Sequence, residues 1–171
     1  MNVFSCLHLR GAALAGALLT SLLAPVAARA QVPGESRVDM ARERQAYTAE
    51  ALREFNRFIN GWSEAWATHD ERRLAGLYSA GPTVAFSPTT IIASHTALLA
   101  FLGDSLPAGS QLRTGIADFV AGEDVYSATG PYMYQASPDA EPVSGTHFTV
   151  LYRERGRWKI RSQAFLPGLP F

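Results

Sequence analysis

The chain has very few of the residues that cross-link proteins or bind metals. Its only cysteine is Cys6, and its four histidines include no pair at the i and i+4 spacing typical of a metal site on a helix. Beyond residue 6 the sequence therefore allows no internal disulfide and no thiolate metal site, and it predicts neither a metal nor a cofactor. The 141 residues after position 30 are enough for one domain that is stabilised by packing alone.

Acidic residues are absent from the first 30 positions. Arg10 is followed by the apolar run 11–23, and the small residues Ala28 and Ala30 precede Gln31. A short basic start, a central apolar stretch and an A-x-A end are typical of a secretory signal peptide. We therefore expect residues 1–30 to be removed during export, so that the mature protein is periplasmic or secreted.

A membrane-spanning run is also missing. Pro25 and Arg29 end the apolar stretch before it reaches the roughly 20 residues that cross a bilayer. Cys6 lies ahead of this stretch rather than at the cleavage point, so a lipid anchor is not expected. The sequence predicts no membrane anchor once the signal has been cleaved.

Excess positive charge is lacking as well. After residue 30 the chain has 13 basic and 15 acidic residues, a formal charge of −2. This balance does not favour nucleic acid or an anionic membrane as a partner. Residues 153–157, Arg-Glu-Arg-Gly-Arg, form a basic run at a predicted turn, and its acid favours a solvated hairpin tip.

The helices can be predicted from periodicity and caps. Residues 31–38 contain Pro33 and Gly34 and predict a flexible start, followed by one domain over residues 39–171. A long helix from Asp39 to about His69 is indicated by apolar residues every three or four positions, namely Met40, Tyr47, Ala51, Phe55, Phe58, Trp62 and Trp66. Two shorter helices, residues 71–79 and 95–102, are expected after the caps Asp70 and Ser94, with Gly81-Pro82 and Gly103 as stops.

Strands dominate the second half of the sequence. They are predicted at residues 83–86, 91–93, 112–121, 125–134, 145–153 and 158–165, with a break or bulge at Gly130-Pro131. Helices first and an antiparallel meander afterwards predict an α+β fold with three helices.

Several short motifs occur in this order of elements. They are Ala-Trp-Ala-Thr-His-Asp at 65–70, Phe-Ser-Pro at 86–88, Thr-His-Phe at 146–148 and Gly-Arg-Trp-Lys-Ile at 156–160. In this respect the chain resembles the NTF2-like superfamily, in particular its SnoaL-like and DUF4440-type branch, over about residues 45–167. The resemblance implies a cone in which a curved antiparallel sheet wraps the long helix and leaves a pocket. Members include isomerases, cyclases, hydrolases, dehydratases and non-catalytic modules, and many are homodimers through the convex sheet face.

The acid–base groups of the steroid isomerase branch are not found here. The positions that match them hold Trp62, Ser87 and Thr146, and none of these is a base at neutral pH. On the closing strand, period-two alternation would place Ser162 and Ala164 towards the cavity. Lys159, Arg161, Gln163 and Phe165 would then face a dimer partner or solvent.

Two titratable residues remain as weak catalytic candidates. Asp118 lies in the middle of a predicted strand, where an acid is unusual. His147 lies between Thr146 and Phe148 in a predicted strand, and its side chain should point to the face opposite theirs. With Phe148 expected in the pocket, we expect His147 on the convex face unless a bulge turns it inward.

Aromatic residues are abundant on the elements of the expected cone. Those nearest the open end, Trp62, Phe86, Tyr132 and Phe148, are predicted to line an apolar pocket. The sequence thus favours an exported domain that holds a small apolar or aromatic molecule. Two alternatives remain open: a SnoaL-like cyclase, isomerase, hydrolase or dehydratase that uses Asp118 or His147 with tyrosine hydroxyls, and a dimeric interaction module with a filled cavity.

Overall fold

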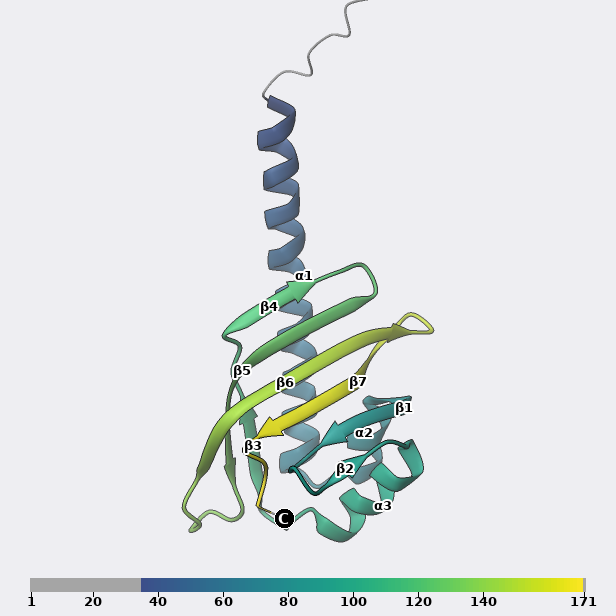
Figure 1. Cartoon of the computed structure of the whole chain (residues 1–171), viewed down its shortest axis with the longest axis vertical. Coiled ribbons are helices and arrows are strands. Elements are labelled where there is room, and N and C mark those ends of the chain that lie inside the picture. The colour runs from purple at the N-terminus through teal and green to yellow at the C-terminus, as the bar shows by residue number, and fades with distance from the viewer. Residues whose placement is uncertain (1–34, 171) are drawn as a thin grey trace, which may run out of the picture. The chain divides into compact units, whose positions relative to one another are not determined.

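The first element of the fold is a helix of which only one half is packed. The computed structural model describes residues 35–170, so the predicted signal peptide lies outside the described residues. Helix α1 spans Glu35–Ala67 and projects beyond the sheet (Figure 1). Its second half is buried at three- and four-residue spacing through Ala51, Phe55, Ile59, Trp62, Ala65 and Trp66.

The first half of α1 differs from the prediction. Residues 35–38, expected to be flexible, are already helical, and residues 37–50 are exposed throughout. Met40 and Tyr47, predicted on the buried stripe, are 59% and 43% exposed. The apolar spacing predicted a helix correctly, but the sheet covers it only from Ala51 onward.

The two short helices begin at the predicted caps. Helix α2 spans Glu71–Gly76, and Asp70 accepts a hydrogen bond from the Arg73 amide at 2.9 Å. Helix α3 spans His95–Ser105, and Ser94 accepts one from the Ala97 amide. Their ends were predicted less well, since α2 stops three residues earlier and α3 continues through Gly103.

Seven strands form one curved sheet in front of α1 in Figure 1. They are β1 (Tyr78–Ala85), β2 (Ile91–Ile92), β3 (Gln111–Thr114), β4 (Asp118–Ala121), β5 (Val125–Gln135), β6 (Val143–Glu154) and β7 (Arg157–Leu166). Their order is β2-β1-β7-β6-β5-β3, and β4 also pairs with β5. The β1–β7 pair is parallel and the other pairs are antiparallel. Over the described residues, 35–170, the α+β class with three helices is confirmed.

The strand break predicted at Gly130-Pro131 occurs instead in the neighbouring strand. β5 is continuous, whereas β3 and β4 are separate segments along its edge. The link between them stays close, because the Gly115 amide donates to the Pro131 carbonyl at 2.8 Å. A Cβ at Gly130 would lie 2.1 Å from the Gly115 carbonyl oxygen, so only glycine allows this approach.

A β-bulge in β7 reverses the predicted faces of the closing strand. Ile160 pairs with Leu151 but Ser162 pairs with Val150, which leaves Arg161 as an extra residue. One extra residue shifts the alternation by one position. Gln163 and Phe165 are therefore buried on the concave face, where Ser162 and Ala164 had been expected.

The neighbouring strand also differs from the prediction. His147 pairs with Phe165 and is 1% exposed on the concave face, whereas Phe148 is 41% exposed on the convex face. Phe148 therefore does not lie with the other three predicted pocket residues.

Candidate functional site

Aromatic rings fill the interior between α1 and the sheet, and Phe165 lies at their centre. Its ring stacks with those of Trp62 at 6.4 Å and Phe86 at 6.1 Å, and meets Tyr132 edge-on at 5.3 Å between centroids. Three of the predicted pocket residues are thus brought together by a fourth residue that the sequence had placed outside. The large apolar Phe165, out of phase with Ile160 along β7, was the signal that could have revealed it.

This aromatic cluster is closed in the described structure. Trp62 and Phe86 have no exposed surface, and Tyr132 and Phe165 keep 2% and 1%. Rings without accessible surface leave no water-sized space beside them. The interior is therefore packed at these positions, and a ligand could reach the rings only after something moves.

A row of hydrogen-bonded side chains crosses the interior beside the rings. We call it the interior polar chain; in order, it consists of Trp62, Tyr78, Gln163, Thr149 and His147. Trp62 Nε1 donates to Tyr78 Oη at 3.1 Å, and Tyr78 Oη donates to Gln163 Oε1 at 2.6 Å. Gln163 Nε2 donates to Thr149 Oγ1 at 3.3 Å.

His147 ends the interior polar chain, and its partners fix its tautomer. Nε2 lies 2.8 Å from the Gly115 carbonyl oxygen and can only donate there. Nδ1, 3.1 Å from Thr149 Oγ1, is then the acceptor. Every hydrogen bond in the chain thus points in one direction, from α1 to the link between β3 and β4.

Burial keeps the side chains of the interior polar chain uncharged. Desolvation lowers the pKa of His147, outweighing its backbone hydrogen bond, and desolvation also raises the pKa of Tyr78. A neutral imidazole with both nitrogens engaged has no free lone pair to accept a substrate proton. In this arrangement His147 stabilises the core and is not placed to act as a base.

The other acid–base candidate lies outside the cone. Asp118 is exposed on edge strand β4. It pairs with Thr129, which in turn pairs with Phe148, so Asp118 lies on the convex face. The two remaining described histidines bind backbone: Gly109 N donates to His69 Nε2 at 2.8 Å, and His95 Nε2 lies 2.9 Å from the Ala75 carbonyl oxygen. His69 thus holds the loop at Gly109, and His95 holds the end of α2.

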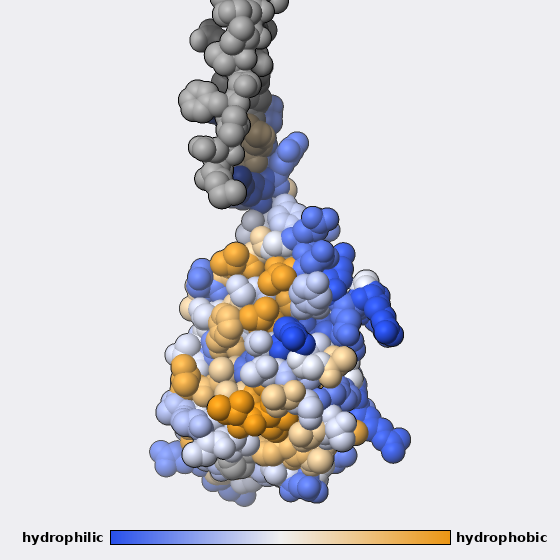
Figure 2. Space-filling view, turned by 45° about the vertical axis from the view of Figure 1, so that its right-hand side comes forward, coloured by the Kyte–Doolittle hydropathy of each residue, from blue (hydrophilic) through white to orange (hydrophobic). Residues whose placement is uncertain are grey.

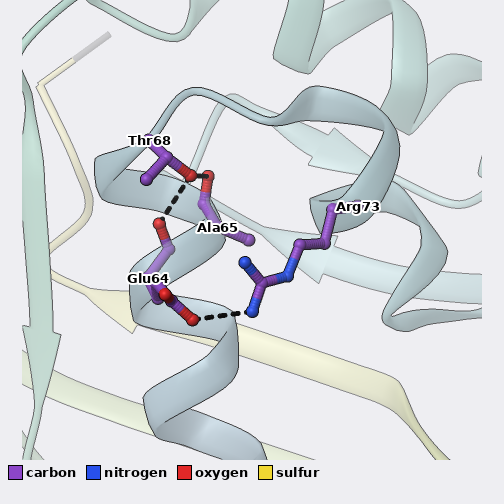
Figure 3. A network of polar contacts seen from close by, with 4 residues as sticks. All are labelled: Glu64, Ala65, Thr68 and Arg73. Carbon is purple, nitrogen blue, oxygen red and sulfur yellow. Dashed lines mark hydrogen bonds and ion pairs between the residues drawn. The ribbon is translucent and has the colours of Figure 1, made fainter.

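The junction of α1 and α2 is fixed by a small polar network (Figure 3). Arg73 forms an ion pair with Glu64 at 2.7 Å, and Thr68 Oγ1 donates to the Glu64 carbonyl at 2.9 Å. Both charged side chains are exposed, so the pair contributes little to stability. The pair joins the end of α1, which carries Trp62, to α2.

The residues after β7 form a C-terminal segment (167–170) that lies over the aromatic cluster. Leu169 is 3% exposed, and its amide donates to the Phe86 carbonyl at 2.6 Å. Tyr132 Oη donates to the Gly168 carbonyl at 2.9 Å. Gly168 has φ +127°, and a Cβ there would lie 2.8 Å from Ser87 Cα, so this path requires glycine.

Within residues 35–170 no three His, Cys, Asp or Glu side chains gather into a metal-binding group. None of the helices described there is long and apolar enough to cross a bilayer.

This protein is similar to known proteins in structure but not in sequence. No family model and no curated protein matches this chain. An NTF2-like protein of unknown function from Shewanella oneidensis matches with a TM-score of 0.56 and 14% identity, over 67% of this chain and 98% of that one. A candidate scytalone dehydratase from Novosphingobium aromaticivorans matches with TM-score 0.59 and 15% identity, over 68% and 83%. An NTF2-like protein from Pseudomonas putida, also of unknown function, gives 0.57 and 16%, over 72% and 89%.

Proposed function

Because the chain has the NTF2-like cone fold, we propose that it is a binding protein for a small, largely apolar molecule held inside the cone beneath the C-terminal segment. The observation that carries this proposal is the place of Leu169. It belongs to a segment outside the sheet, and yet its side chain is buried and its amide donates to the carbonyl of Phe86, a member of the aromatic cluster. A cover of this kind can leave while the sheet stays intact.

Removal of the cover would create a site with suitable chemistry. It would open the rings of Phe86 and Tyr132 and free the Tyr132 hydroxyl that now binds the Gly168 carbonyl. Aromatic walls with one or two hydroxyls are typical of small-molecule pockets. Burial of an apolar ligand yields about 25 cal/mol per Å², which supplies affinity without any charge.

The catalytic alternative has less support. Asp118 faces solvent, and the nitrogens of His147 are engaged by Thr149 and Gly115. The likeness to a candidate dehydratase extends to the fold alone. An enzyme that used His147 would lose turnover in His147→Gln while still binding its substrate, whereas the binding proposal expects no turnover to lose.

A matched pair of variants tests whether the C-terminal segment covers a ligand site. Leu169→Asp places a charge where the side chain is buried, whereas Val38→Asp makes an equally charged change at a position on α1 that is 52% exposed. We expect the fluorescent apolar probe 1-N-phenylnaphthylamine to bind at least about tenfold more tightly to Leu169→Asp than to the parent chain, equivalent to about 1.4 kcal/mol. Val38→Asp should not increase binding.

If folded Leu169→Asp took up no more probe than the parent, the filled-cavity alternative would replace the proposal. Native mass spectrometry of the exported protein gives an independent test, because a bound apolar molecule would add its mass. The intact mass from the same measurement would determine whether the mature chain begins at Gln31, as the signal-like pattern predicts.

We further propose that the mature protein forms a homodimer through the convex face of the sheet. Four exposed apolar side chains lie there on β5, β6 and β7, namely Val125, Met133, Phe148 and Leu166. Figure 2 shows hydrophobic residues exposed in patches over the folded body, and large exposed apolar patches mark interaction surfaces. The earlier choice of Phe165 for this interface was wrong, because the bulge turns Phe165 inward.

Phe148→Asp should therefore convert a dimer to a monomer in sedimentation at micromolar concentration. Val38→Asp, an equally charged change on the exposed half of α1, should leave the dimer intact. A monomeric parent protein would refute the dimer and leave the ligand proposal untouched.

A further inference from the structure

A separate hollow lies outside the cone, where the start of β1 meets the turn between β6 and β7. It has a volume of about 480 Å³ and is lined by Gly76, Tyr78, Ala80, His95, Glu154, Arg155, Arg157 and Lys159. A second hollow of about 310 Å³ adjoins it, lined by Ser79, Ala80, Gly81, Tyr152, Glu154 and Arg161. The two share Ala80 and Glu154, and together we call them the outer groove.

The outer groove is rich in positive charge. Arg155, Arg157, Lys159 and Arg161 line it, against the single acid Glu154. Within residues 35–170 the ion pairs engage Arg73 and Arg153, and none engages these four groups. The basic run that the sequence placed at a solvated hairpin tip thus forms one wall of a hollow.

Two of these cations are held in place across the groove. Lys159 Nζ donates to the Gly76 carbonyl, and an Arg161 Nη donates to the Gly81 carbonyl. Both carbonyls belong to the opposite wall. The two positive groups are therefore oriented before any ligand arrives, which lowers the entropy cost of binding.

Two further observations indicate unused binding capacity. Partial burial and the neighbouring charge of Arg157 lower the pKa of Lys159 despite the opposing effect of Glu154, as expected for crowded cations without a counter-ion. Ser79 is 4% exposed, and its Oγ finds no hydrogen-bond partner within the described part of the chain. Buried hydroxyls are normally paired, so the Ser79 hydroxyl is available to bond a polar atom of a ligand that enters the smaller hollow.

We propose that the outer groove binds a small organic oxyanion, a carboxylate or a phosphate ester. Its charged end lies between Arg157 and Lys159, and its apolar part lies against Tyr152 and Ala80. Arginine and lysine together supply the charge-assisted hydrogen bonds that such an anion needs. The volume of the larger hollow lies within the range of small-molecule sites, which begins at about 300 Å³.

Calorimetric titration with phenyl phosphate and with inorganic phosphate, at low ionic strength, tests this site in the full mature chain. We expect phenyl phosphate to bind more tightly, and Arg157→Gln and Lys159→Gln each to weaken it about tenfold, as the loss of one charge-assisted hydrogen bond predicts. Arg57→Gln is the matched control, because it removes the same charge from an exposed position on α1.

The proposal is overturned if both groove variants bind phenyl phosphate like the parent, or if Arg57→Gln weakens binding equally. Equal affinity for the two phosphates would refute the contact with Tyr152 and Ala80. The interior proposal is tested separately, because Leu169→Asp should change uptake of the apolar probe and leave phenyl phosphate binding unchanged.

Discussion

The interior of the cone and the outer groove both contain polar side chains, but they use them in opposite ways. In the interior, five side chains from Trp62 to His147 are uncharged and hydrogen-bonded in one continuous direction. In the outer groove, four cations lack ion-pair partners within the described residues, and the Ser79 hydroxyl is unpaired there. A satisfied buried network stabilises one structure, whereas unpaired groups retain the capacity to bind.

The bulge at Arg161 in β7 determines which side chains reach each of the two regions. The bulge at Arg161 turns Gln163 and Phe165 into the interior, where they complete the polar chain and the aromatic cluster. The same bulge leaves Arg161 in the groove, where it reaches the Gly81 carbonyl. A single inserted residue thus separates a closed interior from a charged exterior.

The largest effect is expected from the aromatic cluster. Trp62→Ala removes a ring with no exposed surface and should lower the free energy of unfolding by about 3–5 kcal/mol, since the surroundings cannot fill the cavity. Met40→Ala, at a position on α1 that is 59% exposed, should cost no more than about 1 kcal/mol. Urea denaturation measures both, and equal losses would show that the aromatic cluster is not the structural core.

The interior polar chain should respond to loss of a single oxygen. Tyr78→Phe leaves Trp62 Nε1 and Gln163 Oε1 buried without their partner, which should cost about 1–3 kcal/mol. Tyr47→Phe is the control, because its hydroxyl also bonds a carbonyl, that of Gly122, but at an exposed position. If Tyr78→Phe lowered the free energy of unfolding as little as Tyr47→Phe does, the interior polar chain would contribute little to stability.

A pH effect should follow from His147. Its pKa is lowered in the folded protein, while an unfolded histidine titrates near 6.5. Below that pH the unfolded state binds a proton that the folded state does not, so stability falls as pH decreases, by at most about 1.4 kcal/mol per pH unit. Urea midpoints between pH 7.5 and 5.5 should drop less in His147→Gln, and identical slopes would refute this role.

The smallest effect on stability is expected in the outer groove. Arg157 is exposed and forms no ion pair within the described residues, so Arg157→Gln should change the free energy of unfolding by no more than about 0.5 kcal/mol. Thermal unfolding monitored by circular dichroism checks this. A large loss would show that the groove is part of the structural core.

Much of this fold could be predicted from local signals. The capping residues Asp70 and Ser94 gave two helix starts, and the apolar spacing up to Trp66 gave the long helix. The expected NTF2-like cone is confirmed by its structural neighbours, while membership of the SnoaL-like or DUF4440-type branch stays a prediction. These features depend on residues a few positions apart, which a sequence reveals directly.

The site was harder to predict because it depends on register. The bulge at Arg161 reversed the predicted faces of residues 162–165 of β7, and His147 and Phe148 were assigned to the wrong faces. The interior polar chain joins Tyr78 to Gln163, which are 85 positions apart. No periodicity reports a contact of that range, and a one-residue shift in pairing changes which side chains meet.

If the C-terminal segment opens while the cone remains folded, native-state hydrogen exchange of the Leu169 amide should reveal it. This amide donates to the Phe86 carbonyl, so its exchange reports opening of the segment. We expect it to exchange through local opening, with a free energy well below that of core amides such as Ile160. Exchange of Leu169 only by global unfolding, with the same free energy as Ile160, would show that the segment does not open on its own.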